Sequence, residues 1–340
     1  MVEVNFGIVG LGRLGKIHAK NLAKNVPGSM LVAACSIVPE ELEHAKNELG
    51  VEEVYATFDE MINSPSINAV AIVSPSGFHV EQITKAMKKG LHVFTEKPLG
   101  LNVAEIESVI KVINNHPNQI FMLGFMRRYD ESYQYAKRLV DDGEIGELTV
   151  IRCYGIDPSK GMESFVEFAK NNDSGGLFAD MSIHDIDLVR WFTNSEIKKV
   201  WALGKNAAYP ELDKLGELET GAAMMELEDR TMALLVAGRN ASYGYHVETE
   251  LIGTKGSVRI ANIPEKNLVT ILNEKGSVRP LSQDFPERFK MAFINEMKEF
   301  VSCVNEKRQP EGNANDGLQA TKVADACSES WEKNELVKIK

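Results

Sequence analysis

The sequence has little cysteine and no long apolar run. Its 340 residues include 4 cysteines, which are far apart at positions 35, 153, 303 and 327 and form no CxxC pair. This spacing indicates neither a disulfide scaffold nor a zinc knuckle. No apolar stretch approaches the roughly 18 residues of a membrane span, and the N-terminus lacks the basic region of a secretion signal. These absences predict a cytoplasmic protein with no membrane partner.

The chain also lacks an excess of positive charge. It carries 38 basic and 49 acidic residues, a net charge of −11. Such a surface repels a phosphate backbone, so no nucleic-acid partner is expected. The hydrophobic fraction of 44% and charged fraction of 26% are those of an ordinary globular protein. At about 150 residues per domain, the length favours two domains.

Short apolar runs alternate with helical segments in the first third of the chain. Strands are expected at 4–9, 30–35, 54–57, 69–73, 92–95 and 120–124, and helices at 13–23, 39–49, 79–89 and 103–114. Strands separated by helices of this length indicate a parallel sheet covered on both faces. The pattern therefore predicts an α/β, doubly wound Rossmann domain over residues 1–125.

The pattern changes after about residue 145, where strands follow one another more closely. Strands are expected at 149–155, 222–228, 231–237, 247–253 and 257–260, and helices at 183–193, 288–305 and 317–333. Tight connections at 228–230 and 254–256 indicate hairpins. The remainder, residues 126–340, is therefore predicted to be an α+β domain with a large, mainly antiparallel open sheet.

A glycine-rich turn follows the first expected strand and opens the first helix. Gly10, Gly12 and Gly15, with Arg13 and Leu14 between the last two, fit the GxGxxG pattern. The first glycine allows a tight turn, the second lets a pyrophosphate approach the backbone, and the third lets helix and strand pack closely. The helix N-terminus offers N–H groups to the phosphates. We therefore expect dinucleotide binding, although such a turn can also occur without a ligand.

The end of the second strand bears on the choice of cofactor. Dinucleotide-binding domains commonly have an acidic residue there that binds the ribose hydroxyls, whereas this chain has Ser36. Ser36 would not repel the 2′-phosphate of NADP, yet no arginine lies beside it in the sequence to bind that phosphate. The sequence favours NAD without excluding NADP.

Two clusters suggest catalysis. Glu96, Lys97 and Pro98 come at the carboxyl end of an expected strand, where doubly wound sheets bind ligands, and the proline constrains the backbone there. Asp180 and His184 share a face if a helix begins near Asp180, and a histidine beside a carboxylate can accept a proton near neutral pH. The alternatives are a solvated lysine, an N-cap aspartate and a packed or surface histidine.

Together these motifs resemble the Gfo/Idh/MocA oxidoreductases. The resemblance rests on GLGRLG at 10–15, EKP at 96–98 and the aspartate- and histidine-containing segment 175–187. Within that family, GFMRRYD at 124–130 and YGIDP at 154–158 resemble the inositol 2-dehydrogenase branch. The resemblance implies a Rossmann domain followed by an α+β domain for substrate binding and oligomerisation, with the active site between them.

The resemblance also implies an activity and roles for residues. Lys97, Asp180 and His184 would be the catalytic residues of an NAD-dependent oxidation of myo-inositol to 2-keto-myo-inositol, a step of inositol catabolism. His184 would take the hydroxyl proton, Asp180 would orient the proton network, and Lys97 would bond the reacting oxygen. Alternatives are a dehydrogenase of scyllo-inositol or another sugar or polyol, or a non-catalytic dinucleotide sensor.

Further polar residues are candidates for ligand contacts. Ser74, Pro75 and His79 follow the strand 69–73 and are expected on the nicotinamide side of the cofactor, with Glu96 and Lys97. Arg127, Asp157, Tyr243 and Tyr245 are expected to contact the polyol beside the catalytic residues. Their alternatives are a surface arginine in a salt bridge, a turn aspartate before Pro158 and tyrosines of an interface. No metal is expected, because no metal-binding spacing is seen for His18, His44, His92 or His116.

The open face of the predicted second sheet suggests a homotetramer or homodimer.

Overall fold

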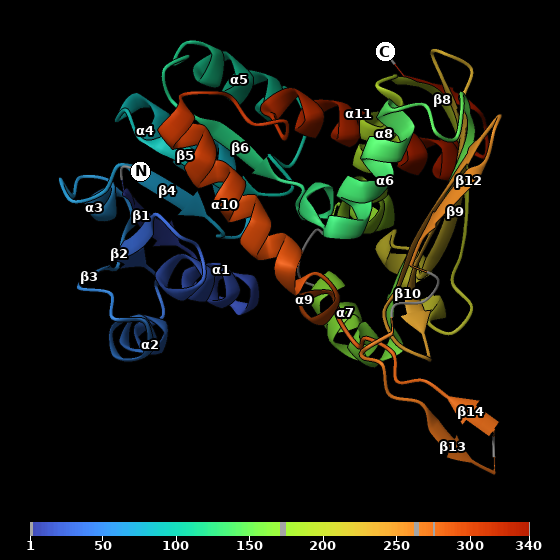
Figure 1. The fold of residues 1–340 in the computed structure, drawn as a ribbon, viewed down its shortest axis with the longest axis horizontal. Helices are drawn as coiled ribbons and strands as arrows, with labels where there is room; N and C mark the ends of the chain where they lie inside the picture. The colour runs from blue at the N-terminus through green and yellow to red at the C-terminus, as the bar shows by residue number, and fades with distance from the viewer. Residues whose placement is uncertain (1–2, 171–174, 262–264, 275, 340) are drawn as a thin grey trace. The chain divides into compact units, whose positions relative to one another are not determined.

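The chain folds into two compact units (Figure 1). The structure, a computed structural model, describes residues 3–170, 175–261, 265–274 and 276–339. One unit comprises the described residues up to Tyr129 together with Met291–Leu318, and the other comprises Asp130–Lys290 and the residues from Gln319 onward. Residues 291–318 lie beyond the predicted boundary at residue 125 and pack within the first unit. The division of the chain at residue 125 into functional domains stays a prediction.

The first unit contains a six-stranded parallel sheet. Its strands are β1 (Val4–Val9), β2 (Ser29–Cys35), β3 (Glu53–Tyr55), β4 (Ala69–Ile72), β5 (His92–Glu96) and β6 (Phe121–Gly124). The spatial order is β3-β2-β1-β4-β5-β6, and every pair is parallel. The chain therefore reverses its direction of travel across the sheet between β1 and β4. This confirms the predicted doubly wound fold, in which ligands bind at the carboxyl ends of the strands near this reversal.

Helices surround this sheet. They are α1 (Arg13–Lys24), α2 (Pro39–Leu49), α3 (Phe58–Met61), α4 (His79–Lys88), α5 (Val103–Asn114), α10 (Lys290–Glu306) and the start of α11 (Ala314–Lys333), with short 3₁₀ turns η1 (Ser76–Phe78) and η2 (Met126–Tyr129). Local signals explain some of their ends, because α2 begins at Pro39 and is followed by the C-cap residue Gly50, whose φ is +73°. Helix α10 belongs to this core because the ring of Phe300 lies 5.5 Å from that of Phe6.

The second unit contains a seven-stranded sheet. Its strands are β7 (Leu148–Pro158), β8 (Ile197–Lys205), β9 (Thr220–Leu227), β10 (Met232–Ala241), β11 (His246–Gly253), β12 (Ser257–Ile260) and β15 (Val337–Lys338), and a separate hairpin is formed by β13 (Ile271–Asn273) and β14 (Gly276–Val278). The order is β12-β11-β7-β10-β9-β8-β15, and only the β7–β10 pair is parallel. The predicted large, mainly antiparallel sheet is confirmed.

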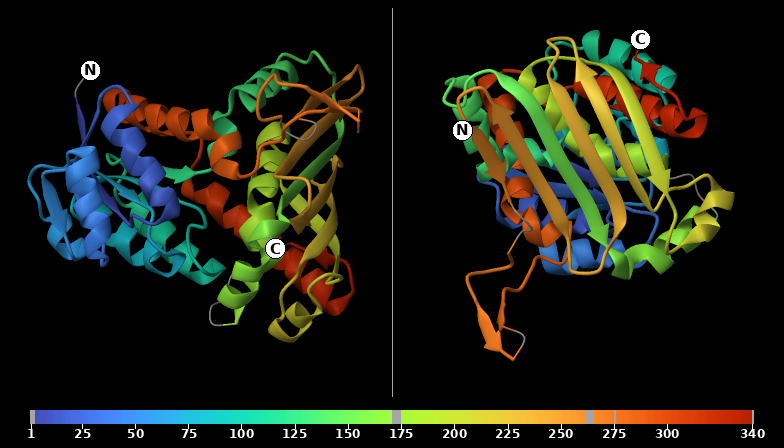
Figure 2. Two further views of the ribbon diagram at one scale, coloured as in Figure 1. Left: turned by 90° about the horizontal axis from the view of Figure 1, so that it is seen from below. Right: turned by 90° about the vertical axis from the view of Figure 1, so that its right-hand side faces the viewer.

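Helices of the second unit leave one face of this sheet open. They are α6 (Glu131–Asp141), α7 (Met162–Ala169), α8 (Ile183–Thr193), α9 (Phe285–Arg288) and the rest of α11, with η3 (Ser159–Gly161), η4 (Phe178–Ser182) and η5 (Pro210–Leu215). Figure 2 shows the sheet from the side on which no helix of the described residues covers its middle strands. Among the described residues, no helix has the length and apolar character that crossing a bilayer requires.

Candidate active site

The glycine turn lies between β1 and α1. Gly10 has a φ of +85°, and a Cβ atom there would come 2.5 Å from the carbonyl oxygen of Val73. A Cβ atom on Gly15 would lie 1.9 Å from the carbonyl oxygen of Gly10. Both positions therefore require glycine, one for its backbone conformation and one for the close contact between turn and helix.

Gly12 differs from the other two glycines. A Cβ atom added there would have no other described atom within 4 Å. Gly12 is the N-cap of α1, and no side chain caps the helix. Packing within the protein does not explain this glycine, whereas the close approach of a pyrophosphate to free N–H groups does. The turn therefore fits a dinucleotide.

Ser36 follows β2 and is held by the first turn of α2. Its Oγ donates a hydrogen bond to Oε2 of Glu41 at 2.6 Å and accepts one from the N–H of Val38 at 3.1 Å. Glu41 thus brings a carboxylate to the end of β2, the place where an acidic residue normally binds ribose hydroxyls. Glu41 was not predicted from the sequence, because the carboxylate comes from a residue five positions further along. The sequence feature that could have indicated this carboxylate is an acidic residue in the first turn of the helix after the strand.

The loop after β4 is held by His79. Its Nδ1 lies 2.7 Å from the carbonyl oxygen of Pro98, and its Nε2 lies 2.8 Å from that of Ser74. Burial lowers the pKa of His79 and outweighs the opposing effect of the two carbonyls. The Ser74 hydroxyl donates to Oε1 of Gln82 at 2.6 Å. His79 therefore joins the Ser74–Pro75 loop to the loop after β5.

Glu96, Lys97 and Pro98 lie at the carboxyl end of β5. Glu96 ends the strand and is buried, whereas Lys97 is half-buried. The peptide bond between Lys97 and Pro98 is cis. The main-chain N–H of Lys97 donates to Oε2 of Glu96 at 3.3 Å. Lys97 is therefore placed at the strand end where the fold binds ligands.

Arg127 belongs to the 3₁₀ turn η2, directly after β6. Its exposed fraction is 3%, so the alternative of a surface arginine does not hold. Its neighbour Arg128 contacts the C-terminal part of the same unit, donating to the carbonyl oxygen of Glu311 at 3.2 Å and pairing with Asp316 at 3.3 Å. Arg127 thus follows a strand end of the parallel sheet, as Ser36, Ser74 and Lys97 do.

Asp180 and His184 lie in consecutive helical segments of the second unit. Asp180 belongs to the π-helical turn η4, and His184 to the first turn of α8. Ser182, and not Asp180, is the N-cap of α8, so the N-cap alternative for Asp180 does not hold. π-Helical turns are rare in proteins, and those that occur often lie at functional sites. His184 is buried, with an exposed fraction of 9%.

A buried arginine holds Asp180. Nη1 of Arg239, on β10, donates to Oδ2 of Asp180 at 2.8 Å. The Arg239 guanidinium carbon lies 3.8 Å from the ring centroid of Phe165. Its Nε and Nη2 atoms are buried, without a hydrogen-bond partner among the described residues. Arg239 was not predicted from the sequence, because the strand expected at 231–237 ends before it, whereas β10 continues to Ala241.

The remaining polar candidates lie at one end of the second sheet. Asp157 is the penultimate residue of β7, so the expected strand end at 155 was too early. Register pairs its neighbour Ile156 with both Gly238 of β10 and His246 of β11. Asp157 therefore lies at the same end of the sheet as Arg239 and as the tyrosines that precede β11.

The two tyrosines have different surroundings. Tyr243 is half-exposed, and its hydroxyl lies 2.8 Å from Nδ1 of His246. Partial burial raises its pKa. Tyr245 is buried and packs edge-on against Phe289, with ring centroids 6.4 Å apart. Tyr243 alone of the pair presents a large exposed surface.

The fold and the glycine turn define an oxidoreductase with an NAD-binding Rossmann domain. Residues 4–125 match the family described as "Oxidoreductase family, NAD-binding Rossmann fold", and residues 133–259 match the "GFO/IDH/MocA C-terminal domain". These two matches cover more than half of the chain. The chain therefore belongs to the Gfo/Idh/MocA family, as its motifs indicated.

Known relatives resemble the chain over nearly its whole length. It is 34% identical to scyllo-inositol 2-dehydrogenase (NAD(+)) of Bacillus subtilis, over 91% of this chain and 88% of that protein. It is 60% identical to scyllo-inositol dehydrogenase from Lactobacillus casei, solved with bound cofactor NAD(H) and scyllo-inositol; the match covers 99% of both chains with a TM-score of 0.96. Myo-inositol 2-dehydrogenase from Lactobacillus plantarum is 49% identical, covers 99% of this chain and 100% of that one, and has a TM-score of 0.97.

Proposed function

We propose that the protein is an NAD-dependent inositol 2-dehydrogenase, which oxidises one ring carbinol of an inositol to a ketone. The observation that carries this proposal is the 60% identity, over 99% of the chain, to a dehydrogenase solved with NAD(H) and scyllo-inositol. The motifs that suggested the activity, from the glycine turn to His184, lie within the matched length.

The first unit holds the cofactor. When bound, NAD supplies the acceptor for the hydride that leaves the carbinol carbon. Gly12 and the N-terminus of α1 bind the pyrophosphate, and Ser36 with Glu41 binds the adenosine ribose. His79 acts through the Ser74 loop that it joins to Pro98. The proposed cofactor-binding residues are Gly10, Gly12, Arg13, Leu14, Gly15, Ser36, Ser74, Pro75, His79, Glu96 and Lys97.

Lys97, Asp180 and His184 carry the proton chemistry. The carbinol loses a hydride from carbon and a proton from oxygen, and the C–O single bond becomes a carbonyl. The His184 imidazole takes the hydroxyl proton. The Lys97 ammonium group donates a hydrogen bond to the reacting oxygen and stabilises its developing negative charge. Asp180, paired with Arg239, orients the proton network.

Arg127, Asp157, Tyr243 and Tyr245 are proposed to bind the remaining hydroxyl groups of the ring. An inositol carries hydroxyl groups and no charge, so its recognition depends on hydrogen bonds. A site that hydrogen-bonds these groups rejects analogues that lack them, because its own polar groups are then left unpaired.

The two candidate substrates, scyllo-inositol and myo-inositol, are stereoisomers. Oxidation of myo-inositol at its axial hydroxyl and oxidation of scyllo-inositol give the same ketone, so the two substrates differ only in configuration at the reacting carbon. The 60% identity to the Lactobacillus casei enzyme favours scyllo-inositol. Myo-inositol, the stereoisomer first expected from the sequence, is the second candidate because of the 49% identity to the Lactobacillus plantarum enzyme.

A substrate panel tests the proposal. Purified protein with NAD is mixed with scyllo-inositol, myo-inositol or glucose, and NADH is followed by absorbance. We expect turnover with an inositol, higher kcat/KM for scyllo-inositol than for myo-inositol, and weaker activity with NADP. Turnover with glucose alone would place the protein among dehydrogenases of other sugars. NADH binding without turnover of any polyol would instead support a dinucleotide sensor.

We also propose that a second copy of the chain covers the open sheet face, giving a homodimer or homotetramer. Trp201, Leu203 and Met224 lie on this face with exposed fractions of 44%, 49% and 53%. Trp201 and Met224 are paired in register, so their side chains are neighbours. Contiguous apolar surface of this kind marks an interaction site.

A cytoplasmic location and a role in inositol catabolism are part of the same proposal. The buried free thiols Cys35, Cys303 and Cys327 fit a reducing compartment.

A further inference from the structure

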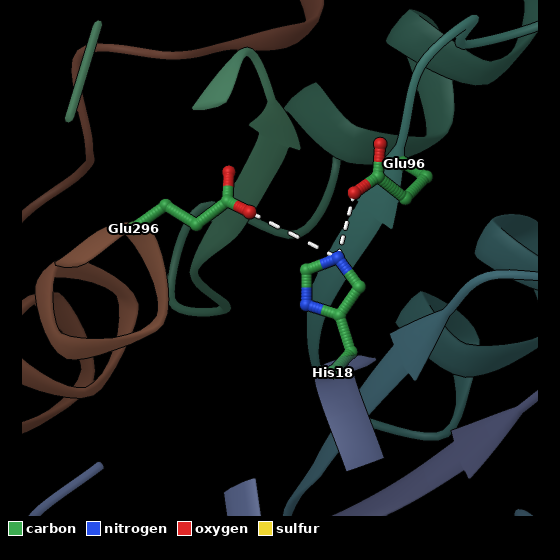
Figure 3. A group of neighbouring side chains, drawn as sticks. All are labelled: His18, Glu96 and Glu296. Atoms are coloured by element: carbon green, nitrogen blue, oxygen red, sulfur yellow. Dashed lines mark hydrogen bonds and ion pairs between the residues drawn. The ribbon is translucent and has the colours of Figure 1, made fainter. Parts of the chain in front are cut away.

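A buried cluster of three titratable side chains lies in the first unit (Figure 3). His18 comes from α1, Glu96 from the end of β5 and Glu296 from α10. Nε2 of His18 lies 2.7 Å from Oε1 of Glu96 and 3.9 Å from Oε1 of Glu296. The exposed fractions of the three residues are 0%, 5% and 0%. Glu96 is among the proposed cofactor-binding residues, whereas neither the predicted chemistry nor the family resemblance gives His18 or Glu296 a role.

The surroundings of Glu296 offer it little stabilisation as an anion. Neither of its carboxyl oxygens has a hydrogen-bond partner among the described residues. Aromatic rings flank the cluster, because the His18 ring lies 5.2 Å from that of Phe94 and 5.5 Å from that of Phe293. Tyr129 of η2 is close enough to interact electrostatically with Glu296, and burial raises the pKa of its phenol. The tyrosine therefore adds no charge.

Burial and a second carboxylate act on Glu296 in the same direction. Burial raises its pKa well above the usual range, and the charge of Glu96 raises it further. The two carboxyl groups and the imidazole present ligand atoms within 4.8 Å of one another. Two ionised carboxylates at this separation inside a protein would repel each other strongly. A proton or a bound cation must therefore offset one of the charges.

The distances favour a proton over a metal ion. The separation of 2.7 Å between His18 Nε2 and Glu96 Oε1 is that of an N–H···O hydrogen bond. Two such atoms bound tetrahedrally to one zinc ion, each at about 2.0–2.2 Å from it, would be roughly 3.3 Å apart. The Nδ1 atom of His18 is buried without a hydrogen-bond partner among the described residues, so an N–H group there would have no acceptor. The proton that offsets the second charge is therefore assigned to Glu296.

The cluster is bonded to the main chain of Lys97. Oε1 of Glu96 contacts His18, while its Oε2 accepts the main-chain N–H of Lys97 at 3.3 Å. A Cβ atom on Gly124 of β6 would lie 3.3 Å from the Glu96 carboxyl group, so the glycine leaves room for it. Glu96 therefore connects α1, which begins in the glycine turn, to Lys97, the residue proposed to bond the reacting oxygen.

We propose that His18, Glu96 and Glu296 form a proton-holding site, in which Glu296 is a neutral carboxylic acid and a positioning residue for Lys97. While Glu296 holds its proton, His18 is bonded to Glu96 alone. If Glu296 ionises, its carboxylate competes with Glu96 for His18 and loosens the support of the Lys97 main chain. The protonation of Glu296 concerns the first unit alone, whereas its effect on Lys97 rests on the proposed function.

Unfolding measured across pH tests the protonation. With a raised pKa, folded Glu296 keeps a proton that unfolded Glu296 loses above about pH 4.3, so this group makes the protein less stable as pH rises. Glu296→Gln has the shape and charge of the neutral acid and removes this loss. We expect its urea midpoint to rise relative to wild type between about pH 5 and pH 9. A variant that is less stable than wild type at neutral pH, or that does not fold, would overturn the proposal.

Glu299→Gln is the matched control one turn further along α10. Arg308 lowers the pKa of Glu299, so this carboxylate contributes stability above its unfolded pKa that is lost as pH falls. We expect the control to be less stable than wild type at neutral pH, with a difference that shrinks in acid. The two glutamate variants should therefore change stability in opposite directions.

Two measurements on the wild-type protein separate a proton from a metal. The infrared spectrum at neutral pH should contain the carbonyl band of a protonated carboxylic acid, and this band should be lost in Glu296→Gln. Elemental analysis of protein exposed to zinc or manganese and then dialysed should find less than one ion per chain. Stoichiometric metal that is absent from Glu296→Gln would identify a cation site and overturn the proposal.

The pH profile of turnover tests the effect on Lys97. We expect the alkaline limit of kcat to move to higher pH in Glu296→Gln, with kcat at neutral pH and the Kd for NADH within about twofold of wild type. An unchanged alkaline limit would overturn the positioning role. If wild type turns over no polyol, the proposed function fails, whereas the unfolding and infrared measurements still decide the protonation of Glu296.

Discussion

Arg239 and Asp180 are 59 positions apart in the sequence, and the Nη1 of one donates a hydrogen bond to Oδ2 of the other at 2.8 Å. The side chain of Arg239 is 7% exposed and that of Asp180 is 38% exposed, so a buried cation holds a carboxylate that solvent can reach. Arg239 of β10 therefore holds in place Asp180, which is one of the proposed catalytic residues.

Replacing Arg239 by leucine should lower kcat about 10- to 100-fold. A hydrogen bond to a charged group is worth about 1.5–3 kcal/mol, and this amount converts to that range of rate. Arg239→Lys should recover only part of the loss, because one ammonium group replaces a planar guanidinium that also stacks on Phe165. The measurement is kcat against pH with saturating inositol and NAD, beside NADH affinity, which should not change.

Arg230→Gln is the control for that experiment. Arg230 lies in the hairpin before β10, its side chain is 80% exposed, and it pairs with Glu226 on the surface. Exposed ion pairs contribute about 0–1 kcal/mol, so turnover should stay at the wild-type level. If Arg230→Gln loses as much turnover as Arg239→Leu, the loss cannot be assigned to the hydrogen bond between Arg239 and Asp180.

Glu41 should set the preference for NAD over NADP. Its carboxylate bonds the Ser36 hydroxyl at 2.6 Å and would repel a 2′-phosphate at the end of β2. In Glu41→Gln the Kd for NADP should fall about tenfold, equivalent to roughly 1.4 kcal/mol, and the Kd for NAD should rise slightly. Glu40→Gln, on the exposed neighbouring position, should leave both affinities unchanged. Equal responses of the two variants in a fluorescence titration would remove Glu41 from this role.

The architecture was largely predictable from periodicity, because both sheets are built from segments with clear local signals. The helices at Pro39–Leu49 and Val103–Asn114 begin and end as predicted. The strand Ile197–Lys205 was missed, since lysines, glycine and apolar residues follow one another there without a simple alternation. The placement of α10 in the first unit was also not predictable, because an apolar helix face does not specify which sheet it covers.

The site was predictable where a motif lies within one segment. The glycine turn and Lys97 at a strand end were found because chain order alone places them at the carboxyl ends of parallel strands. Arg239 and Glu296 were missed because each is proposed to act through a partner that only the fold brings near. Glu41 was missed although its partner Ser36 is only five positions away, because its carboxylate comes from the next helix and not from the strand end. His18 illustrates the limit: its sequence spacing indicates no cluster, yet it contacts Glu96 at 2.7 Å.

Gly12 and Gly15 should respond differently to an added methyl group. A Cβ atom at Gly12 meets no described atom within 4 Å, so Gly12→Ala should keep its stability within about 0.5 kcal/mol and weaken NAD binding at least about tenfold. A Cβ atom at Gly15 would lie 1.9 Å from the Gly10 carbonyl oxygen, so Gly15→Ala should lose about 3 kcal/mol of stability. Urea unfolding and NADH titration separate the two effects. Unimpaired NAD binding by Gly12→Ala would contradict the pyrophosphate role.

Lys97→Met and His184→Asn should each lower kcat at least about 100-fold, the usual contribution of a positioned proton donor or acceptor. Both should still bind NADH, because the glycine turn that binds the pyrophosphate is intact. The loss of affinity should be larger for Lys97→Met, since Lys97 is also a proposed cofactor-binding residue. Single-turnover measurements with scyllo-inositol would separate the chemical step from product release. A variant that keeps wild-type turnover would remove its residue from the catalytic set.

The open face of the second sheet should hold the oligomer together. Met224→Glu places a charge in the centre of the apolar surface that Trp201 and Leu203 share, and burying that charge against a second copy is costly. Light scattering after gel filtration should find a smaller assembly for this variant than for wild type. Met30→Glu is the matched control, because Met30 is a methionine of similar exposure, 45% against 53%, on the first unit. If Met224→Glu keeps the wild-type mass, or if Met30→Glu loses it equally, this face is not the contact between copies.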